Sequence, residues 1–337
     1  MGRTWWARAR LLGGAAILLA LVRTLGAGPF LDGVRTVDGW SLAAATGIAA
    51  VTTVCCAWRW RLVAGGLGVA MPLGPAIAAY YRSQFLNTVL PGGVLGDLHR
   101  GVVHGRDAGD VSRGLRAVGW ERLAGQLVQA ALAVVVLLTL PSPVRSAMPA
   151  GTPAAGLVAL VLAAGAVAIG VRFRSRPRSR SRRLMPSPAG TSRWARAVRA
   201  AGADLRHGVL ARRAWPGIVA ASVVVVAGHA ATFLVAARAT GVPAPPATLL
   251  PLALLILLAM AVPANIGGWG PREGMAAWTF AAAGLGAAQG VATAVAYGVL
   301  ALAANLPGAL VLLAARLAPA GAARSRAGAR RERAAHG

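Results

Sequence analysis

The chain alternates long apolar stretches with short stretches rich in arginine and glycine. Six apolar stretches approach or exceed the ~20 residues that a helix needs to cross the hydrocarbon core of a bilayer. They are Leu11–Gly28, Ser41–Ala57, Leu115–Leu140, Ala154–Val171, Ala214–Ala237 and Ala288–Leu317. The pattern predicts an all-α, polytopic integral membrane protein with six full spans. The last span is expected to kink or end early at Pro307.

Two further apolar segments are broken at matching places. The first runs through Pro72–Leu90 into the break Pro91–Asp97. The second runs from Thr248–Val262 through the break Pro263–Glu273 to Met275–Leu285. Non-helical backbone at membrane depth is tolerated only where it is buried in protein or lines a polar cavity. The order span, hairpin, span in each half predicts an inverted repeat with two re-entrant hairpins, although eight conventional spans would give the same sidedness of the loops.

Composition supports a membrane protein, because 57% of the 337 residues are hydrophobic and only 13% are charged, whereas soluble domains carry about 25% charge. The net charge of +26 does not indicate nucleic acid as a partner, since the arginines lie beside apolar spans. With the N-terminus inside, 28 of the 35 arginines, including Arg59 and Arg61, fall in cytoplasmic pieces. This bias predicts a multi-pass plasma-membrane protein with both termini in the cytoplasm.

Two basic segments stand apart from the apolar pattern. The cytoplasmic loop 172–213 carries thirteen arginines, and a basic tail, 319–337, follows a membrane domain expected to span residues 1–318. Such segments cannot build a core, so we expect a mobile loop and a disordered tail. The loop acts either as a topogenic charge run or as a docking site for anionic lipid or protein. At the N-terminus, we expect Leu11–Gly28 to be a retained helix rather than a removed signal peptide.

Three of the nine acidic residues fall at or inside membrane segments: Asp97, Glu121 and Glu273. A carboxylate there is costly unless it is paired or hydrated, so each is a functional candidate. Arg122 and Arg272 directly adjoin two of them, and Arg100 lies one helical turn beyond the third. These residues either form structural ion pairs that hold the hairpins, or form a positively biased cavity. Such a cavity would receive a lipid phosphate through bared backbone N–H groups and helix N-termini.

Other chemistry is not indicated. His229 lies alone in an apolar helix and is expected to hydrogen-bond between helices. The remaining histidines and the adjacent Cys55 and Cys56 offer no metal pattern. The chain also lacks nucleotide-binding and hydrolase motifs. We therefore expect no cofactor, no metal and no enzymatic activity.

Four motifs resemble a known membrane family. They are LNTVLPGGVLGD at Leu86–Asp97 followed by Arg100, WERLAG at Trp120–Gly125, IGGWGPREG at Ile266–Gly274 and NLPG at Asn305–Gly308. Their order and spacing resemble the flippase-like membrane domain of lysylphosphatidylglycerol synthases, over roughly Leu11 to Leu317. The resemblance implies movement of phospholipid or lipid-linked sugars between leaflets. One departure is Gly298, which follows Tyr297 where the family often has an arginine.

In the synthases a large soluble aminoacyl-transferase domain follows the last span. Only residues 318–337 follow it here, so we do not expect this chain to aminoacylate lipid. The expected activity is translocation of an anionic or lipid-linked substrate. The alternative is a non-transporting partner or regulator of a separately encoded glycosyltransferase or lipid synthase. A lipid-modifying membrane enzyme is disfavoured, because no nucleophile and base are paired in the sequence.

The candidate substrate path contains charged and backbone-exposing residues from both breaks and from the helix between them. The polar core is expected from Asp97, Arg100, Glu121, Arg122, Arg272 and Glu273. The residues expected to expose backbone or polar groups beside it are Asn87, Pro91, Gly92, Gly93, Gly96, Gly267 and Gly268. Besides this substrate, the expected partners are the membrane lipids.

Overall fold

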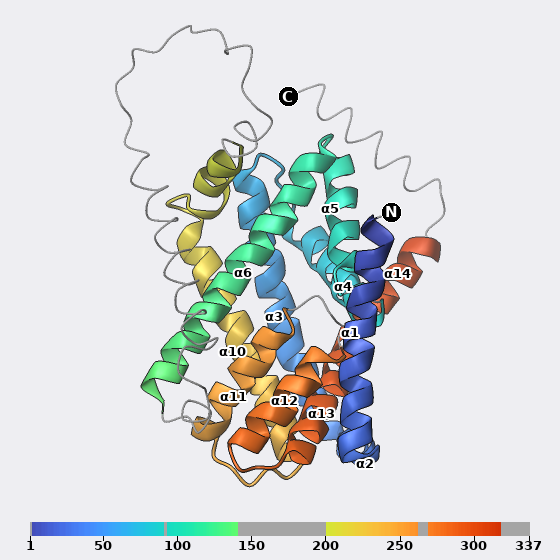
Figure 1. Cartoon of the computed structure of the whole chain (residues 1–337). Helices are drawn as coiled ribbons and strands as arrows, with labels where there is room; N and C mark the ends of the chain where they lie inside the picture. The colour runs from blue at the N-terminus through green and yellow to red at the C-terminus, as the bar shows by residue number, and fades with distance from the viewer. Residues whose placement is uncertain (1, 91–92, 141–199, 262–268, 318–337) are drawn as a thin grey trace, which may run out of the picture.

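A computed structural model of the chain describes residues 2–90, 93–140, 200–261 and 269–317, which fold into helices joined by short turns (Figure 1). The helices are α1 (Gly2–Leu25), α2 (Gly28–Arg35), α3 (Gly39–Gly66), α4 (Leu73–Val89), α5 (Leu95–Asp107), α6 (Val111–Thr139), the π-helical turn η1 (Leu205–Val209), α10 (Trp215–Ala239), α11 (Pro246–Ala259), α12 (Pro271–Ala282), α13 (Ala287–Asn305) and α14 (Pro307–Leu317). The prediction of an all-α protein is confirmed for these residues.

Four of the described helices are long and apolar enough to cross a membrane. They are α3, α6, α10 and the stretch Ala287–Ala315, which covers α13 and most of α14. α1 and α2 meet this criterion only together, and they are bent by 99° where they meet. The predicted span Ala154–Val171 and most of the loop 172–213 lie outside the described residues, as does the tail. A multi-pass membrane protein is thus supported, but the count of six or eight spans is not confirmed.

α3 is longer than the predicted span Ser41–Ala57. It begins after Asp38, whose carboxylate accepts from Ser41 N at 2.8 Å while Ser41 Oγ accepts from Asp38 N at 3.1 Å, a capping box. The helix then continues past Arg59, which we expected in a cytoplasmic loop. That placement is wrong, because Arg59 is only 6% exposed and Glu121 of α6 gives it a buried partner.

The helices repeat one order in the two halves of the chain: long, short, short, long. In the first half α3 is followed by the α4–α5 hairpin and α6, and in the second half α10 is followed by the α11–α12 hairpin and α13. The two hairpins lie towards opposite ends of the bundle (Figure 1). This arrangement agrees with an inverted repeat. The break after α13, at Pro307, is also confirmed.

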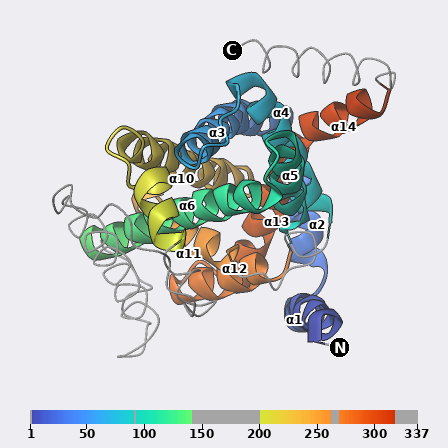
Figure 2. The ribbon, with the colours of Figure 1, turned by 90° about the horizontal axis from the view of Figure 1, so that it is seen from above.

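The described helices form two main apolar cores, and each core contains residues from both halves. In the first half Trp60 packs edge-on against Tyr80, with ring centroids 6.5 Å apart. In the second half Phe233 packs edge-on against Phe280, with centroids 6.3 Å apart. Many leucines and valines stay exposed on the outer faces, including Leu310 at 66%, as expected for helices that face lipid. Viewed from above (Figure 2), α1 lies at the edge of the bundle, where it contacts α12.

Candidate functional site

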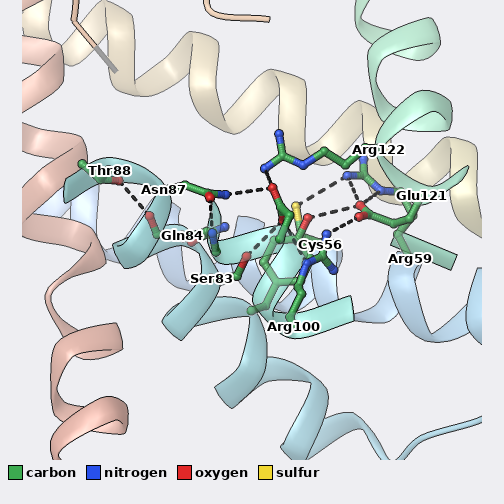
Figure 3. A network of polar contacts seen from close by, with 12 residues as sticks. Cys56, Arg59, Ser83, Gln84, Asn87, Thr88, Arg100, Glu121 and Arg122 are labelled. Carbon is green, nitrogen blue, oxygen red and sulfur yellow. Dashed lines mark hydrogen bonds and ion pairs between the residues drawn. The ribbon is translucent and has the colours of Figure 1, made fainter. Parts of the chain in front are cut away.

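Glu121 of α6 is the centre of a buried network of charges. Its side chain is 0% exposed. Oε1 accepts hydrogen bonds from Arg59 Nε at 2.8 Å and Arg59 Nη2 at 2.5 Å. Oε2 accepts from Arg100 Nη2 at 2.6 Å. The Tyr80 hydroxyl donates to Oε1 at 3.1 Å. Glu121 therefore ties together α3, α4, α5 and α6 (Figure 3).

Arg59 comes from the C-terminal half of α3 and is fixed on both sides. Its Nη1 donates to Ser222 Oγ of α10 at 3.0 Å. Its guanidinium also lies against Gly125 of α6, where a Cβ would be 2.7 Å from Nη1. A residue larger than glycine at position 125 would push the guanidinium away from Glu121. Gly125 thus makes room for the ion pair, which is a packing role rather than a substrate contact.

Asp97 lies in the first turn of α5, at the tip of the first hairpin. A carboxylate there is favoured by the helix dipole. Oδ1 accepts from Ser83 Oγ at 3.0 Å and from Arg100 Nε at 2.9 Å. Oδ2 accepts from Asn87 Nδ2 at 2.8 Å and also contacts Arg122 in an ion pair. The predicted contact between Asp97 and Arg100, three residues apart, is confirmed.

Asn87 and Gly96 hold the two arms of the hairpin together. Asn87 Oδ1 accepts from the backbone N–H of Gly96 at 2.8 Å, so the Asn87 amide bridges the start of α5 and the Asp97 carboxylate. A Cβ at Gly96 would overlap the backbone of Ser83 in α4. Gly96 therefore allows the two arms to approach closely.

Arg100 joins the two carboxylates and is almost fully buried, at 1% exposed. Its guanidinium carbon lies 4.6 Å from the ring centroid of Trp60 and 4.3 Å from that of Tyr80. Cation–π contacts of this kind stabilise a desolvated guanidinium. Among the described residues, Arg100 Nη1 has no hydrogen-bond partner. The network therefore contains one buried N–H donor group that could bind a ligand.

We call the charged network of Arg59, Asp97, Arg100, Glu121 and Arg122 the first cluster. Its positive and negative charges do not balance. Among the described residues, three arginines, Arg59, Arg100 and Arg122, contact two carboxylates. Arg122 is also the accessible member, with a side chain that is 42% exposed, whereas that of Asp97 is 8% exposed. The cluster therefore carries one positive charge in excess, and the guanidinium at its edge can reach a ligand. Such an arrangement can hold an anion.

Arg272 and Glu273 form a second, separate pair at the start of α12. Arg272 Nε and Nη2 donate to Glu273 Oε1 at 2.8 and 2.5 Å. Glu273 Oε2 accepts from the backbone N–H of Gly270 at 2.6 Å. Glu273 thus caps the N-terminus of its own helix. The φ of Gly270 is +117°, a conformation that favours glycine.

The second pair is enclosed by aromatic rings. The Arg272 guanidinium carbon lies 4.8 Å from the ring centroid of Trp269 and 5.6 Å from that of Tyr297. Gly298 leaves the space that this guanidinium fills, since a Cβ there would overlap Nη2. The Tyr297 hydroxyl hydrogen-bonds His229 Nδ1 at 3.1 Å, which confirms His229 as an interhelical hydrogen-bonding residue.

The residues predicted to line the substrate path fall into three groups, which are members of the first cluster, the second pair, and the remaining proline and glycine residues of the two breaks. The first cluster joins Asn87, Gly96, Asp97, Arg100, Glu121 and Arg122, while Arg272 and Glu273 form the second pair. Within the described ranges no hydrogen bond or ion pair joins a member of one set to a member of the other. Gly93 has a φ of +61°. Pro91, Gly92, Gly267 and Gly268 lie outside the described residues.

The structure changes one pairing and adds residues that the sequence analysis missed. Glu121 does not pair with its neighbour Arg122, because Arg122 reaches Asp97 instead. The added residues are Arg59, Tyr80, Ser83 and Ser222. A signal for Arg59 was present, since Trp58 and Trp60 flank it. In the part of the chain that is described, no three His, Cys, Asp or Glu side chains are grouped as metal ligands.

Comparisons with known proteins agree with this geometry. The family model described as the lysylphosphatidylglycerol synthase TM region matches residues 6–308. The matched range includes both charged sites and both hairpins. A comparison with individually curated proteins gives no match. The assignment of the chain to a family therefore rests on the family model.

Proposed function

The chain belongs to the lysylphosphatidylglycerol synthase transmembrane family, and we propose that it moves a phospholipid or a lipid-linked anionic substrate between leaflets. The family ties the chain to the membrane and to lipid metabolism. Translocation is the function that the first cluster supports best. The substrate would be held by charge and hydrogen bonds alone, without covalent chemistry.

The observation that carries this proposal is the excess positive charge of the first cluster. Burying ions inside a membrane protein is costly, so they are expected to serve a pathway or to be fully neutralised. The second pair is neutral, but the first cluster has three arginines for two carboxylates. An anionic headgroup would supply the missing negative charge. Release of the headgroup would return Arg122 to Asp97.

The position of the cluster in the fold also fits a substrate site. Asp97 belongs to the first turn of α5, directly after the break between α4 and α5. Backbone N–H groups at a helix N-terminus attract anions. In transporters with inverted repeats, substrates bind near such broken helices. At the first hairpin, the N-terminus of α5 and the half-exposed guanidinium of Arg122 thus lie close together.

We place both termini in the cytoplasm of a plasma-membrane protein, because of the arginine bias. A cysteine introduced by Ser179→Cys in the arginine-rich loop should then resist an impermeant thiol reagent added outside intact cells. Ready labelling from outside would overturn this orientation. A partnership with a separately encoded glycosyltransferase or lipid synthase is compatible with transport and is a proposal of its own.

The direct test of transport is a leaflet-resolved assay. Purified protein is reconstituted into liposomes that contain a fluorescent anionic phospholipid, and an impermeant reductant reports how much of the probe reaches the outer leaflet. We expect faster exchange than in protein-free liposomes, and faster exchange of the anionic than of a zwitterionic probe. Exchange no faster than in protein-free liposomes, for either probe, would contradict the proposal.

A further inference from the structure

Beyond Arg122, α6 carries two glutamines on one face. Gln126 and Gln129 lie four and seven residues after Arg122, a spacing that places all three on one side of a helix. Both glutamines are partly exposed. Neither side chain takes part in a hydrogen bond within the described residues. This polar stripe is defined here as Arg122, Gln126 and Gln129.

The contacts at its two ends show where the stripe runs. At one end Arg122 contacts Asp97 at the tip of the first hairpin. At the other end the same face continues through Ala133 and Leu137, which are buried in the apolar cluster that contains Leu252 of α11. α6 therefore passes from the first hairpin to the second, as Figure 1 shows. The glutamines lie on the part of α6 between the two hairpins.

An unpaired amide on a membrane helix needs a hydrogen-bonding environment. Exposure of such a group to acyl chains is unfavourable, because lipid tails offer no donor or acceptor. Between Leu123 and Leu138 the most exposed positions of α6 are apolar: Leu123 at 46%, Val135 at 54% and Leu138 at 62%. Polar residues in membrane helices face the bundle interior or a hydrated path. The stripe is thus suited to water or to a polar ligand.

We propose that Gln126 and Gln129 line a hydrated path for a lipid headgroup, which starts at Arg122 and leads from the first hairpin towards the second. This inference rests on the proposed function and adds the residues that contact the moving headgroup. A glutamine offers two N–H donors and one carbonyl acceptor. It therefore matches a phosphodiester whose headgroup also carries hydroxyl groups. The Arg122 guanidinium would bind the phosphate in bidentate fashion.

The first part of the test measures water at the stripe, independently of transport. Gln126→Cys and Gln129→Cys proteins in liposomes are treated with a water-soluble thiol reagent. Val135→Cys, on an exposed apolar position, is the control, and the wild-type chain gives the background of its two native cysteines. Because thiolates form and react in water, we expect labelling about tenfold faster at 126 and 129 than at 135. Equal rates at all three positions would overturn the hydrated path.

The second part identifies the ligand and its source. Phosphatidylglycerol in the liposomes should slow labelling at 126 and 129 about threefold relative to phosphatidylcholine, and Arg122→Gln should abolish this protection. Protection by soluble glycerol 1-phosphate equal to that by the lipid would overturn a lipid path in favour of a free phosphate ester. No protection by either compound would overturn the ligand site.

The two proposals fail in different ways. If the wild type shows lipid protection at 126 and 129 but no exchange between leaflets, transport is rejected and the stripe stands as a lipid-binding site. If exchange is present and the glutamines are neither labelled nor protected, transport stands and the stripe is rejected. A Gln126→Leu, Gln129→Leu double variant that melts as the wild type but exchanges lipid more slowly would support both.

Discussion

The first cluster is joined across the bundle, whereas the second pair is joined along one helix. Glu121 receives Arg59 from α3 and Arg100 from α5, over sequence separations of 62 and 21 residues. Glu273 binds its neighbour Arg272 and the N–H of Gly270. Both sites contain buried guanidinium groups, a glycine that leaves room for one of them, and aromatic rings. They differ because the charges of the first cluster join separate helices, whereas those of the second pair join neighbouring residues at the start of one helix.

This difference separates two roles that the sequence suggested for all the membrane carboxylates. The second pair is neutral and caps α12, so a structural role accounts for each of its contacts. The first cluster has an excess positive charge and a half-exposed Arg122, which a purely structural network does not need. Under the proposed function, we therefore assign the substrate role to the first hairpin and a structural role to the second.

The largest effect is expected for Glu121→Gln. This change removes the carboxylate that pairs with Arg59, and one of the two that pair with Arg100, while both guanidinium groups stay buried. Breaking a buried pair costs about 3–5 kcal/mol. Thermal unfolding in detergent should show a large loss of stability or no folded protein. Adding Arg59→Gln should recover part of the loss, because the stranded charge is removed. A single variant that melts as the wild type would contradict a central role for Glu121.

A smaller effect is expected for Glu273→Gln. The glutamine carbonyl can still accept from Gly270 N, but the charge opposite the buried Arg272 is lost. Breaking one buried pair costs about 3–5 kcal/mol, whereas Glu121→Gln breaks two such pairs. The melting temperature should fall, while lipid exchange per folded molecule should stay close to wild type. Glu332→Gln in the tail is the control and should change neither. Loss of exchange in a well-folded Glu273→Gln protein would place the second pair in the path.

The smallest effect is expected at Asp38, an exposed carboxylate that caps α3 without an arginine partner. The backbone N–H of Ser41 hydrogen-bonds the carboxylate and lowers the pKa of Asp38 below its ordinary value. The cap is therefore stabilising above the unfolded pKa, and its contribution is lost as the pH falls through the folded pKa. Asp38→Ala should lower the melting temperature slightly at about pH 6 and hardly at about pH 3. A difference that grows on acidification would contradict this account.

Much of the architecture could be predicted from the sequence. Apolar length and arginine bias indicated the long helices, and the proline and glycine breaks indicated the two hairpins. The i, i+3 spacing predicted the pair Asp97–Arg100, which is a local contact. The structure adds α2 and extends α3 to Gly66, because helix ends depend on caps and tertiary partners that hydropathy does not report.

The charged site was only partly predictable, because its partners lie far apart in sequence. Adjacency suggested Glu121 with Arg122, but side chains of successive helical residues diverge by about 100°, so neighbours on a helix seldom pair. Arg59 was assigned to a loop because a charge at the end of an apolar stretch resembles a topogenic residue. Only the packing of α3 against α6 reveals that Glu121 neutralises it. The sequence alone does not reveal that Gly125 and Gly298 make room for buried guanidinium groups.

The most direct test of the central claim is lipid exchange by Arg122→Gln in liposomes, normalised to folded protein. The side chain is half exposed, so its stability should stay within about 1 kcal/mol of wild type. Loss of a charged contact to the moving headgroup should slow exchange of an anionic probe by about tenfold. Arg113→Gln, which removes the partner of Asp110 in an exposed pair, is the matched control and should exchange as the wild type. Normal exchange by a folded Arg122→Gln protein would contradict the assignment of the first cluster as the substrate site.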